Sequence, residues 1–140
     1  YKRLKAGQSC FCSDTARDFL DMSDFLRFMD MAIDQEAPTG IFNVASGESH
    51  SIREIFDLVV DYLELGHREV PLIPPAADDV PVVSLDASET LKAFGWRADI
   101  GFAETIRRQL AWYDEYGVTD VFSHLKATDA SESIEGPGHE

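Results

Sequence analysis

The clearest pattern in the sequence is a stripe of apolar residues at helical spacing between positions 52 and 63. Its members recur every three or four residues: Ile52, Ile55, Phe56, Val59 and Leu63. Ser51 stands directly before the stripe and Glu54 follows it in the capping-box spacing, which satisfies backbone amides at the start of a helix. We therefore predict a helix that begins after Ser51 and ends before Gly66.

Two further apolar stripes predict helices on either side of this one. Ser23 is a suitable N-cap for a helix that runs to about residue 33. A second stripe predicts a final helix that ends at Gly117. The residues that we expect on the buried faces are Phe25, Met29, Ala32 and Ile33 in the first helix, and Phe102, Ile106, Leu110 and Tyr113 in the last.

Two short helices complete the helical prediction. Residues 1–6 carry basic side chains before Gly7, as the last turn of a helix does. A domain rarely begins inside a helical pattern, so we expect the chain to be truncated on its N-terminal side. Asp86 or Ser88 can cap another short helix, which ends near Gly95.

Short apolar runs between the helices predict strands. Residues 19–22 and 41–44 are expected to be buried strands, residues 70–73 a third strand, and residues 82–85 an extended segment. Residues 46–49 carry turn chemistry. The alternation of helices and strands predicts a small mixed α/β domain over residues 1–117. Residues 118–140 are polar and acidic, and we expect this tail to be disordered.

The charge and the cysteines restrict the partners of the chain. Twelve Lys and Arg stand against 26 Asp and Glu, a formal net charge of -14 that disfavours nucleic acids and anionic membranes. No apolar run is long enough to span a membrane. Cys10 and Cys12 point to opposite faces of an extended segment and are poorly placed for a disulfide, which favours a reduced, cytoplasmic setting. The four histidines lack metal-ligand spacing, so we expect no metal.

Two motifs resemble a known family. The run from Arg17 to Asp24 reads R-D-F-L-D-M-S-D, and residues 42–47 read F-N-V-A-S-G. Both resemble the C-terminal substrate-binding part of extended short-chain dehydrogenases/reductases, the nucleotide-sugar epimerases and dehydratases. The later pair Gly95-Trp96, after a short helix, is also similar to the family. The resemblance covers residues 1–117 and implies a small mixed α/β substrate-binding lobe that lacks the Rossmann nucleotide-binding half.

The resemblance implies a function for the complete enzyme rather than for this chain alone. Such an enzyme oxidises a sugar hydroxyl with NAD(P), changes the keto intermediate and reduces it again. The sequence has no glycine-rich strand-turn-helix, so we expect the chain alone to bind no NAD(P) and to need the missing Rossmann half in cis. The expected ligand is a nucleotide sugar, and the family allows a homodimer of the complete enzyme. Tyr1 and Lys5 match the catalytic Y-x-x-x-K pair but lie too close to Arg17 to serve as that pair.

The resemblance also implies four substrate-binding residues. The family arginine matched by Arg17 contacts the diphosphate, although a structural ion pair with Asp18 or Asp21 is the alternative. Phe19 occupies an aromatic position of the motif, as a core residue or as a ligand contact. Phe11 is a candidate for stacking on the nucleotide base. Asp79 matches a family aspartate.

The sequence departs from the family at Ala76. Relatives carry a second diphosphate-binding arginine at this position, whereas here the loop holds Asp78 and Asp79 and lacks that cation. We weigh two functions: the substrate-binding portion of an NAD-dependent nucleotide-sugar epimerase or dehydratase, inactive without its Rossmann half, and a non-catalytic binding or interaction module derived from that lobe. An unrelated α/β domain with matching motifs is the third alternative.

Overall fold

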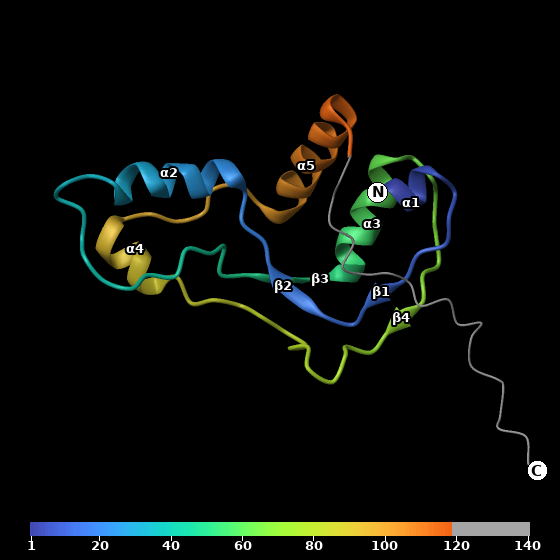
Figure 1. Cartoon of the computed structure of the whole chain (residues 1–140), viewed down its shortest axis with the longest axis horizontal. Coiled ribbons are helices and arrows are strands. Elements are labelled where there is room, and N and C mark those ends of the chain that lie inside the picture. Colours follow the sequence, from blue (N-terminus) through green and yellow to red (C-terminus); the bar gives the residue numbers. More distant parts are fainter. Residues whose placement is uncertain (119–140) are drawn as a thin grey trace, which may run out of the picture.

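The computed structural model describes residues 1–118 as a small mixed α/β fold with two arms (Figure 1). One arm holds α2 and α4, and the other holds α1, α3 and α5, with β2 and β3 between them. The predicted tail lies outside the described residues except for Val118. The elements are α1 (Lys2–Lys5), β1 (Cys12–Ser13), β2 (Ala16–Asp18), α2 (Met22–Ala32), β3 (Ser49–Ser51), α3 (Ile52–Tyr62), β4 (Leu72–Ile73), α4 (Ser88–Phe94) and α5 (Phe102–Tyr116).

The described strands form two small sheets. β1 pairs in parallel with β4, and β2 pairs antiparallel with β3 so that Arg17 lies opposite His50. On the side of β2 away from β3, Ala16 forms a parallel bridge with Val82. The segment that carries Arg17 therefore runs between β3 and the chain around Val82, where the two arms meet (Figure 1).

The capping box of α3 and the glycine stops of α4 and α5 are confirmed. The predicted cap of α4 is wrong, because its N-cap is Ala87, whose side chain makes no cap hydrogen bond. Ser51 and Glu54 form both halves of the capping box, and α3 begins directly after Ser51. α4 ends at Gly95, which adopts the left-handed conformation with a φ of 63°. α5 runs from Phe102 to Tyr116 and stops at Gly117. These helix ends depend on local chemistry, which the sequence displays directly.

The predicted strand at residues 19–22 and the predicted cap of α2 are wrong. The strand lies earlier, at Ala16–Asp18, where the backbone pairs with β3. Asp21 is the N-cap of α2, and its carboxylate accepts a 2.8 Å hydrogen bond from the amide of Ser23. Ser23, the predicted cap, is therefore inside the helix.

The predicted buried stripe of α2 is also wrong. Asp24 and Phe28 are the buried residues of this helix, whereas Ile33 is 73% exposed. Phe28 packs edge-on against Phe94 and Trp96, with ring centroids 5.1 and 5.4 Å away. The buried face of α2 is thus the one that meets α4 and the segment after it. Tertiary contacts, rather than the apolar pattern of the helix, determine which face is buried.

Residues 41–44 are not a strand, contrary to prediction. Ile41 is 99% exposed, and the backbone carbonyl of Asn43 accepts a hydrogen bond from the hydroxyl of Thr90 at 2.5 Å. The Asn43 side-chain amide donates to the carbonyl of Asp86 at 3.0 Å. Hydrogen bonds to α4 and to the residue before it therefore hold this segment in place, without pairing to a neighbouring strand.

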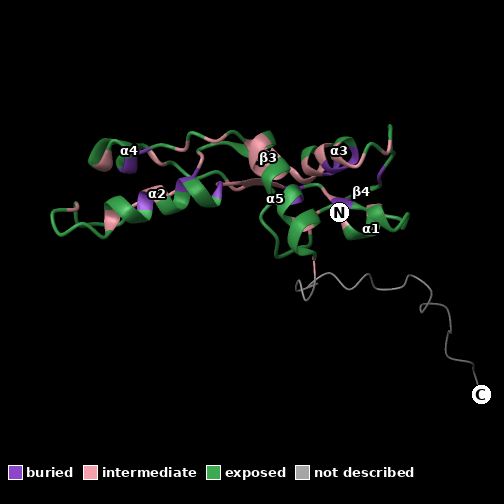
Figure 2. Cartoon of the chain, turned by 90° about the horizontal axis from the view of Figure 1, so that it is seen from above, coloured by how far each residue is buried: buried purple, intermediate pink, exposed green. Residues whose placement is uncertain are grey.

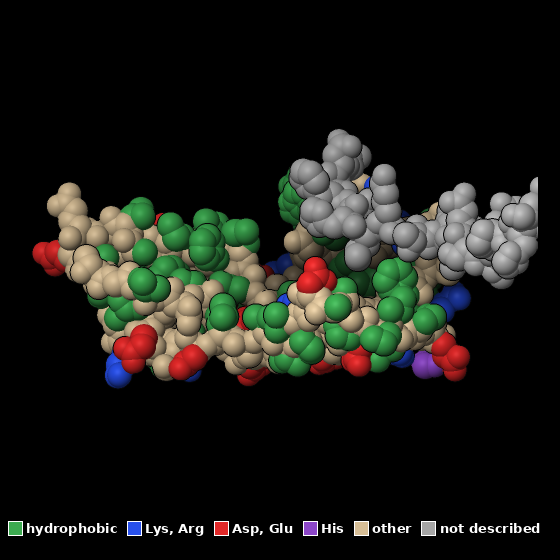
Figure 3. Space-filling model, turned by 60° about the horizontal axis from the view of Figure 1, so that its bottom comes forward, with side chains coloured by type: hydrophobic (Ala, Val, Ile, Leu, Met, Phe, Trp, Pro, Cys, Tyr) green, Lys and Arg blue, Asp and Glu red, His purple; other side chains and the backbone are tan. Residues whose placement is uncertain are grey.

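Buried residues form small groups along the molecule (Figure 2). The core of one arm packs Cys12 of β1 against Phe56 and Val60 of α3 and against Val70. In the other arm, Trp96 is 1% exposed and lies beside Phe28. Hydrophobic side chains are spread over the face shown in Figure 3. The exposed large apolar residues of α2 are Met22, Phe25, Leu26, Met29 and Met31.

None of the described helices combines the length and the apolar character that a membrane crossing requires.

Candidate functional site

Arg17 lies on β2 with its guanidinium held by three acceptors. Nη2 is 2.5 Å from Oδ1 of Asp79, and Nη1 donates to the carbonyls of Ala16 at 2.8 Å and Pro81 at 3.3 Å. The side chain is 28% exposed. Arg17 does form the structural ion pair that was the alternative to a ligand contact, but its partner is Asp79 rather than Asp18 or Asp21. Arg17 is thus pre-positioned at the surface and can still donate to an anion.

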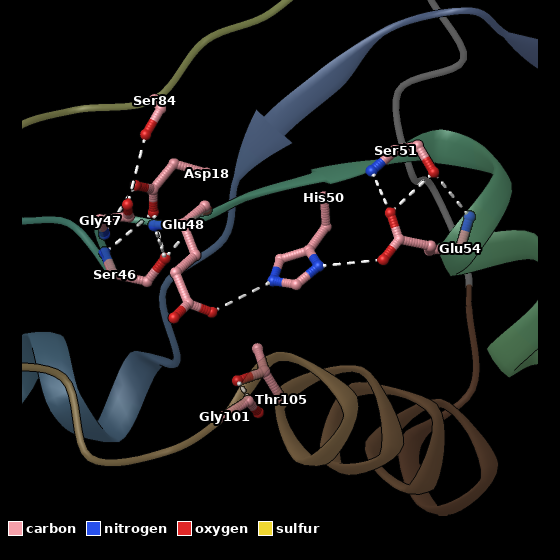
Figure 4. Close-up of polar contacts among 10 residues, drawn as sticks. All are labelled: Asp18, Ser46, Gly47, Glu48, His50, Ser51, Glu54, Ser84, Gly101 and Thr105. Carbon is pink, nitrogen blue, oxygen red and sulfur yellow. Dashed lines mark hydrogen bonds and ion pairs between the residues drawn. The ribbon is translucent and has the colours of Figure 1, made fainter.

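Asp18 joins the two family-like motifs. Its Oδ1 accepts hydrogen bonds from the amide of Ser46 at 2.9 Å and from the Ser46 hydroxyl at 2.7 Å, and its Oδ2 accepts from the amide of Gly47 at 2.9 Å (Figure 4). Gly47 has a φ of 83°, which glycine adopts readily. The carboxylate next to Arg17 therefore anchors the turn of the second motif. The only sequence signal for this link was that both motifs occur in the same chain.

Phe19 packs against the first residue of α5. The ring centroids of Phe19 and Phe102 are 5.5 Å apart at an interplanar angle of 42°. Phe19 also lines a pocket of about 370 Å³ between α3 and α5, together with residues such as Ile55, Val59 and Leu110. The residue is half-buried, so it contributes to packing and also reaches an open cavity.

Phe11 and Asp79 are the two remaining predicted site residues. Phe11 directly precedes β1 and is 43% exposed. Asp79 lies in the loop before the bridge at Val82, and its amide donates to the carbonyl of Ala76 at 3.0 Å. The structure thus brings Arg17 and Asp79 together, and position 76 of the Asp79 loop is an alanine.

His50 belongs to this region, although its sequence context suggested no role. Its ring stacks on Phe102 with centroids 3.8 Å apart and planes 2° apart. Nδ1 is 3.2 Å from Oε1 of Glu54, and Nε2 is 3.7 Å from Oε2 of Glu48 (Figure 4). The sequence held one signal for the contact with Glu54: this residue follows His50 by four positions at the start of a helix, and residues at that spacing are neighbours. The contact with Phe102 had no local signal.

Hydrogen bonds make several carboxylates strongly acidic, among them Glu54 and Asp114. The amide and hydroxyl of Ser51, and then His50, lower the pKa of Glu54 to about 2. Lys5, Tyr1 and Tyr62 lower the pKa of Asp114 to about 2. Both acids are ionised at neutral pH. The Asp114 cluster ties α1 and α3 to α5, so Tyr1 and Lys5 join helices in this structure.

Three helices of the described chain have an acidic first turn, which disfavours an anion such as a dinucleotide pyrophosphate at their N-termini. α2, α3 and α5 each carry a carboxylate in the first turn: Asp24, Glu54 and Glu104, respectively. A negative charge at this position opposes an anion that would bind the helix amides. In α3, the capping box also occupies the amide of Glu54. Among the described residues, no group of three or more His, Cys, Asp or Glu is placed to hold a metal ion.

Comparison with known proteins gives a consistent result at the level of structure. No protein-family model matches the chain, and no curated protein matches it. Bordetella bronchiseptica WbmG, in a crystal structure with NAD and UDP, is 61% identical with a TM-score of 0.82 over 91% of this chain and 41% of that one. WbmH from the same organism, in complex with NAD+, is 32% identical with a TM-score of 0.76 over 84% of this chain and 39% of that one.

A more distant match shows the fold alone. UDP-glucose 4-epimerase from Thermotoga maritima, with UDP-glucose, is 19% identical with a TM-score of 0.71 over 81% of this chain and 37% of that one. The chain thus spans about two fifths of the length of the structures that it matches. The expected fold class and the expected resemblance are both confirmed.

Proposed function

We propose that this chain, a structural relative of the substrate-binding part of extended short-chain dehydrogenases/reductases, provides the nucleotide-sugar site of an NAD-dependent epimerase or dehydratase. The observation that carries the proposal is the 61% identity to WbmG, an enzyme whose crystal structure contains NAD and UDP. Identity at this level over 91% of the chain supports a shared ligand class, which a fold likeness alone would not.

Arg17 is the proposed diphosphate contact. A guanidinium offers five donors in a planar fork, and two of its nitrogens here point to Asp79 and to backbone carbonyls. A diphosphate that approaches the exposed edge adds acceptors to a cation already held in place, which reduces the ordering cost of binding. Asp79 orients the guanidinium, and Phe19 and Phe11 offer apolar surface to the nucleoside and sugar.

The nicotinamide cofactor of the proposed enzyme is held outside these residues. The acidic first turns of α2, α3 and α5 are unsuited to its pyrophosphate. The 140-residue chain therefore binds and orients the substrate, and a Rossmann nucleotide-binding half supplies oxidation and acid-base chemistry. We accordingly propose that the chain alone is inactive. Turnover of UDP-glucose by purified residues 1–140 with added NAD would contradict this.

A non-catalytic binding module is the second candidate. The observation in its favour is the loop around Ala76, where the family's second arginine is missing and Asp79 already neutralises part of the charge of Arg17. The coding sequence upstream of residue 1 distinguishes the two: an in-frame Rossmann segment supports the enzyme, and a start codon supports the module.

A thermal-shift screen tests the proposed ligand class. The full chain is melted with UDP-, dTDP-, GDP-, CDP- and ADP-sugars, and the proposal predicts that at least one raises the melting temperature, because a ligand of the folded state stabilises it. Arg17→Ala should abolish the shift. The matched control is Arg97→Ala, which removes an arginine after α4 whose side chain is 78% exposed. Absence of a shift with every nucleotide sugar would refute the proposal.

A further inference from the structure

We propose that Phe102, the first residue of α5, is a positioning residue that holds Phe19 in place at the ligand site. This role rests on the proposed function, in which Phe19 offers apolar surface to the nucleotide sugar. It depends on the ring of Phe102, which contacts both a residue of β3 and the residue that directly follows β2.

The ring of Phe102 is itself held by a stacked neighbour. His50 of β3 lies on it with ring centroids 3.8 Å apart and planes 2° apart, and Figure 4 shows the ring of His50 next to the start of α5. The ring of Phe19 meets Phe102 at a centroid distance of 5.5 Å and an angle of 42°. Aromatic pairs at these separations attract each other beyond the effect of burial alone. Turning Phe19 away from this position therefore breaks an aromatic contact.

α5 is a firm base for this contact because other elements hold it. Near its C-terminal end, Asp114 accepts a 2.8 Å hydrogen bond from the hydroxyl of Tyr62 on α3. Closer to its start, Arg108 lies 3.7 Å from the carboxylate of Asp21, the N-cap of α2. Phe102 thus projects from a helix whose position is set by both α2 and α3.

Phe19 needs such a contact because little else restrains its side chain. The residue is half-buried and lines the cavity of about 370 Å³ between α3 and α5. β2, which precedes it, pairs with β3 over three residues, and a two-stranded ribbon is only marginally stable by itself. Ordering a side chain during binding costs affinity, and a contact that orders it beforehand lowers this cost. Phe102 therefore favours binding through Phe19.

Isothermal titration of UDP-glucose into the 140-residue protein measures this effect. Phe102→Leu keeps an apolar side chain at the start of α5 but removes the flat ring, so we expect about fivefold weaker binding, the strength of one aromatic contact. Phe102→Tyr keeps the ring and should bind within about twofold of wild type. Equal affinities of wild type and Phe102→Leu overturn the role of Phe102.

Phe94→Leu is the matched control for a loss of stability alone. Phe94 belongs to the aromatic cluster with Phe28 and Phe42, at centroid distances of 5.1 and 5.0 Å. Each leucine variant loses aromatic contacts, so thermal melting should show a lower melting temperature for both. Only Phe102→Leu should lose affinity. An equal loss of affinity in Phe94→Leu means that binding follows stability, which overturns the positioning role.

A double-mutant cycle shows whether Phe102 acts through Phe19. Phe19→Leu removes the ring that Phe102 holds and should itself weaken binding. Adding Phe102→Leu to this variant should then change the affinity by less than about twofold, because residues that act through one contact are not additive. A further fivefold loss in the double variant shows that the two residues act independently and overturns the positioning role.

The proposed function can fail separately from the role of Phe102. Wild-type binding that Arg17→Ala abolishes, together with unchanged affinity in Phe102→Leu, overturns the role of Phe102 and leaves the proposed function standing. Failure of the wild-type protein to bind UDP-glucose or any other nucleotide sugar overturns both.

Discussion

Asp18→Ala is expected to destabilise the protein by about 3 kcal/mol. The substitution removes three hydrogen bonds, two from the backbone amides of Ser46 and Gly47 and one from the Ser46 hydroxyl. Hydrogen bonds to a charged group contribute about 1.5 to 3 kcal/mol each, but Asp18 is half-buried and bonds that share one acceptor group are not additive. The expected loss is a substantial share of the roughly 5 to 15 kcal/mol that stabilises a typical domain.

Urea unfolding followed by circular dichroism measures this loss. A lower midpoint with an unchanged slope reports a change in stability alone. Asp18→Asn keeps one acceptor oxygen and should lose about half as much. The matched control is Asp34→Ala, because Asp34 is exposed and accepts one 2.9 Å hydrogen bond from the amide of Glu36. The reasoning is refuted if Asp18→Ala is no more destabilised than Asp34→Ala.

Three further predictions concern stability and association. Asp24→Ala leaves the amides of Asp99 and Ile100 without their 2.9 Å acceptor and should cost about 3 kcal/mol in urea unfolding. Phe28→Ala should cost about 3 to 5 kcal/mol by the same assay, because it opens the aromatic cluster of that arm. The exposed apolar side chains of α2 should cause concentration-dependent self-association of the 140-residue chain in analytical ultracentrifugation, and a monomer at every concentration would contradict this.

Acid should destabilise the fold through the cluster around Asp114. Its pKa is about 2 in the folded protein, below the ordinary value of about 3.9, so its contribution is present above pH 4 and is lost as the pH falls toward 2. Asp114→Asn should weaken this part of the acid dependence, measured as the urea midpoint between pH 2 and pH 5. Equal acid sensitivity of wild type and variant would show that Lys5, Tyr1 and Tyr62 do not stabilise the ionised carboxylate.

The sequence predicted the elements whose ends depend on local chemistry. The capping box at Ser51 and the glycine after α5 are visible in a few adjacent letters, and both helices form as expected. The buried face of α2 was not predictable in this way. Its choice of Asp24 and Phe28 depends on amides and rings that come about 70 residues later in the chain.

The strands and the candidate site also combine features that adjacent residues predict with features that depend on distant contacts. The described strands contain two or three residues, too few for a hydrophobic period to be recognised. Motif spacing placed Arg17 at the site, but its partner Asp79 and the stack of His50 on Phe102 join distant segments. Such pairs are properties of the folded chain, and the alternative partners expected for Arg17 were accordingly wrong.

Calorimetric titration of UDP-glucose into wild-type protein and Arg17→Ala is the most direct test of the proposed ligand site. We predict measurable binding by wild type and a loss of at least about tenfold in the variant, as removal of one charge-assisted contact to a diphosphate requires. Arg97→Ala should bind like wild type. Equal affinities for wild type and Arg17→Ala would contradict the assignment of Arg17 as the diphosphate contact.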